Sequence, residues 1–87
     1  MSDLRQGVAP AGHAVLHYLE AQQDGWGDIH DTPSQMELAH NQATIALHAY
    51  HAEDYARARD LAIDAAARLI DAIGEMDREI AGDVVHG

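Results

Sequence analysis

Apolar residues recur at intervals of three and four through the second half of the chain, in two adjacent seams. One seam comprises Tyr55, Ala58, Ala62, Ala65, Leu69, Ala72 and Met76, and the other comprises Ile63, Ala66, Ile70, Ile73 and Ile80. A repeat of about 3.5 residues keeps each seam on one side of a helix. The pattern therefore predicts a long helix over residues 54–81 with a wide apolar face, followed by a frayed tail at 82–87.

A second helix is predicted over residues 33–51, where the apolar positions again follow a helical period. The positions that predict its buried stripe are Met36, Ala39, Ala43, Leu47 and Tyr50. Thr32 precedes this stripe as a candidate N-cap, with Pro33 in the first turn and Gln35 placed to close a capping box. These residues predict that the helix begins directly after Thr32.

A first helix is predicted over residues 10–24, because Pro10 suits a first helical turn. Its apolar stripe is modest and consists of Val15, Leu16 and Leu19. Asp24 and Gly25 are predicted to end the helix, since glycine readily adopts the left-handed conformation of a C-cap. The glycine-rich, acidic residues 25–31 are expected to form a linker.

The composition agrees with an all-α fold, since the 87 residues include many alanines and only two prolines. The length predicts a single helical domain over residues 1–87, in which a core would be small. We expect a three-helix bundle with an antiparallel helical hairpin, a long C-terminal helix, and the first helix packed across the hairpin. Because the first helix offers few large apolar side chains, the wide face of the third helix predicts a homodimer through that helix.

Ala49-Tyr50, Asp54-Tyr55 at the predicted turn, and the small residues Ala58 and Ala65 form a recurring pattern of small and aromatic residues. This pattern resembles a single helical hairpin of the tetratricopeptide-repeat family, over about residues 43–69. Glu53 stands where that family usually has a glycine before the turn. The resemblance implies an antiparallel helix pair and a peptide- or protein-binding role.

The charge is strongly acidic, with a formal net charge of −10 from 15 acidic and 5 basic residues, and the basic residues are all arginine. This balance argues against direct binding to nucleic acid or to an anionic membrane, because both require a positive surface. On the third helix, Asp64, Arg68 and their polar neighbours at intervals of three and four are interpreted as a solvent-exposed face with ion pairs.

The acidic excess is concentrated between Arg5 and Arg57, where the only other basic side chains are histidines. Acids beside a tryptophan are typical of a surface that binds an arginine- or lysine-rich partner. The predicted partner-binding residues are Glu20, Asp24, Trp26, Asp28, Asp31 and Glu37. The alternative interpretation is that Trp26 folds back and caps the bundle.

The leading functional hypothesis is a non-catalytic interaction protein that presents an acidic surface to a protein partner with a basic surface. One concrete form is a small inhibitor that blocks a nucleic-acid-binding groove by mimicking nucleic acid, as phage- or plasmid-encoded inhibitors do. The alternative is a helical adaptor or dimerisation module that binds a peptide or helix through apolar contacts. These two hypotheses differ in salt dependence, which is steep only for the acidic surface.

Six histidines lie in the same base-free span. His13 and His17 share one helix face at the spacing that chelates a divalent metal, and Glu20 continues that face. The third hypothesis is therefore a small metal-binding protein that uses zinc or iron as a cofactor. Protonation of the histidines near pH 5–6 offers a different role, in which acidification weakens binding by the acidic surface.

Catalysis is not expected, so the chain is predicted not to be an enzyme. It has no cysteine and no lysine, its two serines, Ser2 and Ser34, lie at a terminus and in a helix's first turn, and it lacks a glycine-rich phosphate loop. The sequence also shows no targeting segment and no apolar run that could span a membrane. We therefore expect a cytoplasmic protein.

Overall fold

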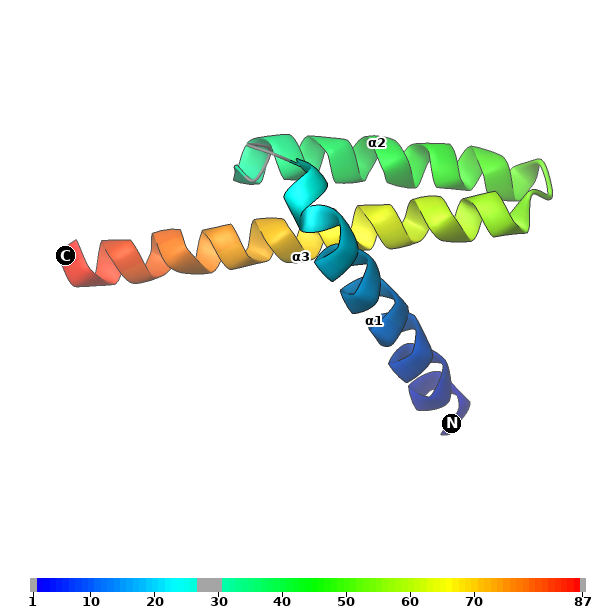
Figure 1. Cartoon of the computed structure of the whole chain (residues 1–87), viewed down its shortest axis with the longest axis horizontal. Coiled ribbons are helices and arrows are strands. Elements are labelled where there is room, and N and C mark those ends of the chain that lie inside the picture. Colours follow the sequence, from blue (N-terminus) through cyan, green and yellow to red (C-terminus); the bar gives the residue numbers. More distant parts are fainter. Residues whose placement is uncertain (1, 27–30, 87) are drawn as a thin grey trace.

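A computed structural model describes the backbone of residues 2–26 and 31–86, and the side chains of 9–22, 25–26 and 31–82. It contains the helices α1 (Ser2–Gln22), α2 (Thr32–His51) and α3 (Tyr55–His86), and a short 3₁₀ helix η1 (Gln23–Trp26) after α1. The described residues contain no strand. The predicted all-α, three-helix fold class is thus confirmed, and Figure 1 shows the arrangement.

The helices α2 and α3 form a hairpin in which they lie side by side and run in opposite directions (Figure 1). The α3 helix has 32 residues and α2 has 20, so the C-terminal third of α3 projects beyond the beginning of α2 (Figure 1). Helices of about a dozen residues are marginally stable on their own in water. The projecting part of α3 therefore receives little support from the rest of the described chain.

The α1 helix crosses α3 near the middle, and its N-terminal half leads away from the hairpin (Figure 1). Among the described elements, α1 packs on α3 and not on α2, whereas the sequence predicted that it crosses the whole hairpin. The radius of gyration is consequently 15.0 Å, compared with about 12 Å for a compact domain of this length. The fold is open rather than compact.

Several helix ends differ from the sequence-based prediction. The α1 helix begins at Ser2 and runs through Pro10, although proline inside a helix removes one backbone hydrogen bond. It then continues into η1, and Gly25 does not adopt the left-handed conformation expected of a C-cap. At the other end of the chain, α3 continues past Gly82 to His86, where a frayed tail was predicted.

The start of α2 also differs by one residue from the prediction. The N-cap is Asp31, whose side chain accepts a hydrogen bond of 3.1 Å from the backbone N–H of Ser34. Hydrogen bonding to the side chain of Ser34 and to its backbone N–H lowers the pKa of Asp31. The hydroxyl of Thr32, the predicted cap, is buried and has no hydrogen-bond partner among the described residues. Gln35 does not close a capping box, because its side chain points into the hairpin.

The connection between α2 and α3 is short, because the same few residues cap the end of α2 and the beginning of α3. The backbone N–H of Glu53 donates to the carbonyl of Tyr50, and that of Asp54 donates to the carbonyl of Ala49, which together form a Schellman motif. The Asp54 carboxylate then accepts from the backbone N–H of Arg57 and caps α3. Glu53 occupies the left-handed position of the motif with φ of 63°, where glycine is normally favoured.

Replacement of Glu53 by glycine is expected to increase the free energy of unfolding by about 0.5–1 kcal/mol. The left-handed conformation costs a non-glycine residue about 1–2 kcal/mol, and this gain exceeds the roughly 0.4–1 kcal/mol that glycine's freedom adds to the unfolded chain. Urea unfolding followed by circular dichroism measures the change. Glu53→Ala is the control, because alanine removes the same charge and keeps the strain; equal stabilisation by both variants would contradict the explanation.

Candidate functional site

The apolar core of the hairpin is built almost entirely from alanine. Its buried members are Ala39, Ala46 and Ala49 on α2 and Ala65, Ala67 and Ala72 on α3. Small side chains allow two helix backbones to approach closely, but they bury little apolar surface. Larger buried groups must therefore supply the specificity of this packing, and in this protein those groups are mainly polar.

Asp64 on α3 is 5% exposed and holds the three helices together. Its carboxylate accepts hydrogen bonds from the hydroxyl of Tyr18 on α1 at 2.5 Å, from Nε2 of Gln42 on α2 at 3.0 Å, and from Nε of Arg68 at 2.9 Å. Burial would raise the pKa of Asp64, but these hydrogen bonds and the charge of Arg68 outweigh burial and lower it. Burial and the bond to Asp64 raise the pKa of Tyr18 to about 12.

A second part of the same polar network surrounds Arg68. Its Nη1 donates to Oε1 of the fully buried Gln35 at 2.9 Å, and Nε2 of Gln35 donates to Asp71 at 2.7 Å. The Arg68 guanidinium also lies 4.7 Å from the centre of the Trp26 ring, in a cation–π contact. The network thus links α1, α2 and α3 through charge-assisted hydrogen bonds and η1 through the cation–π contact.

The network corrects two sequence-based interpretations. Asp64 and Arg68 do form an ion pair, but this side of α3 faces α2 and Trp26 instead of solvent. Trp26 is 8% exposed, so it caps the bundle and is not available as an exposed anchor for a partner. The physical reason is the cation–π attraction, because the positively charged guanidinium of Arg68 lies over the face of the indole ring inside the protein.

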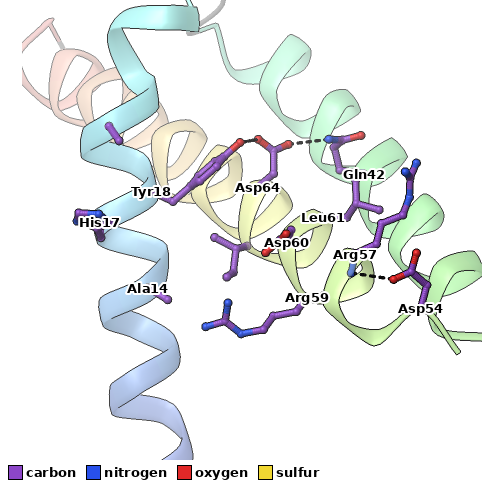
Figure 2. A pocket seen from close by; sticks show the side chains of 12 residues that line it. Ala14, His17, Tyr18, Gln42, Asp54, Arg57, Arg59, Asp60, Leu61 and Asp64 are labelled. Carbon is purple, nitrogen blue, oxygen red and sulfur yellow. Dashed lines mark hydrogen bonds between the residues drawn. The ribbon is translucent and has the colours of Figure 1, made fainter.

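The network borders an open groove of about 880 Å³ between α1 and the beginning of α3. Figure 2 shows Tyr18 and Gln42 reaching Asp64 from opposite sides, while Arg59 extends toward α1. The polar groups at the inner end of the groove therefore form hydrogen bonds with one another. Such mutual pairing stabilises the fold.

The outer side of the hairpin carries a large apolar surface, which we call the apolar face. Its exposed members are Met36, Leu47 and Tyr50 on α2 and Tyr55, Leu69, Ile70, Ile73 and Ile80 on α3, with exposed fractions from 38% to 61%. The rings of Tyr50 and Tyr55 contact each other edge to face at 5.3 Å. Three of these members, Leu47, Tyr50 and Tyr55, also line a shallow hollow between the two helices, together with Ala46, Ala58, Arg59 and Ala62.

The apolar face contradicts the buried stripe that was predicted for residues 33–51. Met36, Leu47 and Tyr50 were expected to be buried, and they are about half exposed. The side of α2 that packs on α3 instead contains Gln35, Ala39, Gln42, Ala46 and Ala49, of which Gln42 is half-buried and the others are buried. These residues are spaced at intervals of four and three, as expected for one face of a helix. The face was not recognised from the sequence because two of its positions are glutamine instead of an apolar residue.

The structure describes only some of the predicted acidic partner-binding residues. Glu20 and Glu37 are exposed on α1 and α2, while Asp31 is exposed and occupied as the N-cap of α2. The Asp24 side chain and the whole of Asp28 lie outside the described residues.

The predicted metal ligands do not converge. His13 and Glu20 are exposed on α1, and His17 lies at the edge of the groove. Among the described residues, no three histidine, aspartate or glutamate side chains are close enough to hold a metal ion. The zinc or iron site expected from His13, His17 and Glu20 is therefore not formed there.

No family model matches the chain, and no significant similarity to a curated protein or to a solved structure was found. The pattern over residues 43–69 therefore stays a local resemblance to a tetratricopeptide-type hairpin. Within the described residues, none of the helices combines the length and the apolar character that crossing a membrane requires.

Substitution Tyr18→Phe is expected to lower the free energy of unfolding by about 1–2 kcal/mol, because the hydroxyl donates to a buried charged acceptor. Tyr50→Phe is the matched control, since Tyr50 is 57% exposed, and its effect should stay within about 0.5 kcal/mol. Both values come from urea unfolding. Equal effects of the two substitutions would mean that the bond to Asp64 contributes nothing to stability.

The lowered pKa of Asp64 predicts acid lability with a definite sign. The folded protein binds this proton more weakly than the unfolded chain, so the stabilisation is present above the ordinary pKa of 3.8 and is lost as the pH falls below it. Unfolding free energies measured from about pH 5 to about pH 3 should therefore fall less steeply for Asp64→Asn than for the wild type. Asp60→Asn, an exposed site on the same helix, should retain the wild-type slope.

Proposed function

We propose that the protein is a non-catalytic interaction module whose apolar face binds a helix. The observation that carries this proposal is the exposure of large apolar side chains on the hairpin, such as Leu47, Ile73 and Ile80, which are 52–61% exposed. Isolated apolar residues are normal on protein surfaces, whereas a continuous apolar patch is typical of an interaction site. Helices commonly bind other helices through apolar residues at intervals of three and four.

The total accessible surface supports the same proposal. The chain exposes 6423 Å², whereas a compact monomer of its mass exposes about 5000 Å². The excess of about 1400 Å² is larger than the roughly 800 Å² that each partner contributes to a stable interface of ordinary size. A bound helix would cover surface that the chain itself leaves open.

Binding of a basic partner is the second candidate, and the distribution of exposed charges favours it. Among the described side chains, the exposed acids are Glu20, Asp31, Glu37, Glu53, Asp54, Asp60, Asp77 and Glu79, and the exposed bases are Arg57, Arg59 and Arg78. An excess of this kind attracts positively charged surfaces. The inhibitor that mimics nucleic acid belongs to this candidate, but the burial of Trp26 deprives it of its proposed anchor.

Affinity capture at two salt concentrations is expected to separate the candidates. The immobilised protein should retain its partner from about 0.1 M to about 1 M salt if the apolar face binds, because screening weakens only interactions between charges. The double variant Ile73→Ser/Ile80→Ser should then lose the partner, and the double variant Glu20→Gln/Glu37→Gln should retain it. Circular dichroism checks that both variants remain helical.

The opposite result identifies the acidic surface. In that case the partner is released at high salt and by Glu20→Gln/Glu37→Gln, and the serine variant still binds it. A partner that binds equally well to both double variants would contradict both candidates, because neither surface would then take part in binding.

A further inference from the structure

We propose that the helix bound by the apolar face is α3 of a second copy of the chain, packed antiparallel about an axis near residue 68. This inference rests on the proposed function and names its partner. Four observations carry it: the heptad spacing of the exposed seam, its two charged positions, a groove beside α1, and the projecting end of α3.

The exposed side of α3 has the spacing of a helix–helix interface. Its positions at intervals of three and four are Ala56, Arg59, Ile63, Ala66, Ile70, Ile73, Asp77 and Ile80, which we call the outer seam. Ile70, Ile73 and Ile80 are 38%, 52% and 61% exposed, while Ile63 and Ala66 are half-buried. A heptad repeat of this kind packs knobs into holes against a second helix.

The outer seam is complementary to itself only in the antiparallel direction. With an axis near residue 68, residues equally distant from 68 on either side face each other. Ile63 then faces the partner's Ile73, while Ala66 and Ala56 face the partner's Ile70 and the partner's Ile80. Each contact joins two isoleucines or one isoleucine and an alanine, so the layers fill without overlap of large side chains.

The two charged positions in the outer seam specify the same direction. Arg59 and Asp77 are exposed and form no ion pair with each other or with other described residues. In the antiparallel register, Arg59 faces the partner's Asp77 at both ends of the contact. A parallel contact in register would instead place Arg59 beside the partner's Arg59, and like charges at facing positions are destabilising.

A hollow beside the outer seam would receive side chains of the partner. A shallow apolar groove of about 240 Å³ between α1 and α3 is lined by Ala11, Ala14, Val15, Arg59, Ala62 and Ile63. The antiparallel register brings the partner's residues 73–80 beside residues 56–63, and therefore to this groove. The C-terminal part of this range continues into the portion of α3 that projects beyond α2 (Figure 1), so each copy would cover part of the projecting end of the other.

Charge exchange in the outer seam tests both the partner and its direction. Sedimentation equilibrium should show a wild-type dimer at tens of micromolar protein. Arg59→Asp and Asp77→Arg should each weaken dimerisation about tenfold, because two attractive pairs become repulsive, and the double variant should return to within about threefold of the wild type. Glu79→Arg is the control, since it makes the same charge change on an exposed position of α3 outside the seam, and it should leave dimerisation unchanged.

Because the chain contains no cysteine, single cysteines give an independent measure of direction. A mixture of Ala56→Cys and Ile80→Cys chains should form a disulfide-linked heterodimer on mild oxidation, whereas neither variant alone should link to itself. In the antiparallel register the two copies of position 56 lie roughly 36 Å apart along the helix axis, far beyond disulfide reach. Self-linking of either variant would overturn the antiparallel arrangement.

Failure of this inference is distinguishable from failure of the proposed function. A wild-type chain that remains monomeric at about 200 μM, a concentration far above typical specific dissociation constants, would exclude a second copy as the partner. If that monomer still captures another protein through Ile73 and Ile80, the proposed function stands with a different partner. A monomer that captures nothing through these residues would exclude both.

Discussion

The buried carboxylate of Asp64 is the interaction on which the rest of the structure depends. A charge in a low-dielectric interior is tolerated only when hydrogen bonds replace its hydration. Tyr18, Gln42 and Arg68 together provide that replacement, and they come from α1, α2 and α3. Displacement of any of these helices would leave the charge buried with fewer partners. The network therefore specifies where α1 crosses α3 and in what register α2 pairs with α3.

This arrangement explains why α3 presents its apolar seam outward. The alanines of the hairpin leave space for extended polar side chains such as Gln35 and Arg68, and the network occupies that space. The helix can direct only one side toward α2. Once the charged side is buried, Ile70, Ile73 and Ile80 must lie near the surface, where they are 38–61% exposed.

The sequence predicted the existence and the order of the helices, because the period of about 3.5 residues depends only on local geometry. It also located the connection near residues 52–54, where the chain needs a sharp turn. Positions of helix ends were less predictable: Asp31 and Thr32 are both good N-caps, and the choice between them depends on the packing of the first turn. The local preference of proline for the first turn of a helix does not explain why Pro10 lies inside α1.

The candidate site was harder to predict, because hydrophobic periodicity assumes that the more apolar side of a helix is buried. In α3 that assumption fails, since Asp64 and Arg68 compensate each other's charge inside the hairpin. Trp26 was ambiguous for a related reason: its burial depends on Arg68, which is distant in sequence and becomes a neighbour only after the helices pack. On α2, two glutamines lie on the same helix face as the buried alanines. This was the one local pattern that could have indicated a polar interior.

The net charge of −10 also acquires a role in this arrangement. An exposed apolar surface promotes non-specific association, and a strong net charge opposes it by repulsion between molecules. This repulsion acts over about 8 Å at physiological ionic strength, so it affects every approach of two copies. In the proposed dimer, burial of the apolar seam and the approach of Arg59 to the partner's Asp77 would offset this repulsion. Under that proposal, the high net charge and the locally complementary seam together favour one specific contact over aggregation.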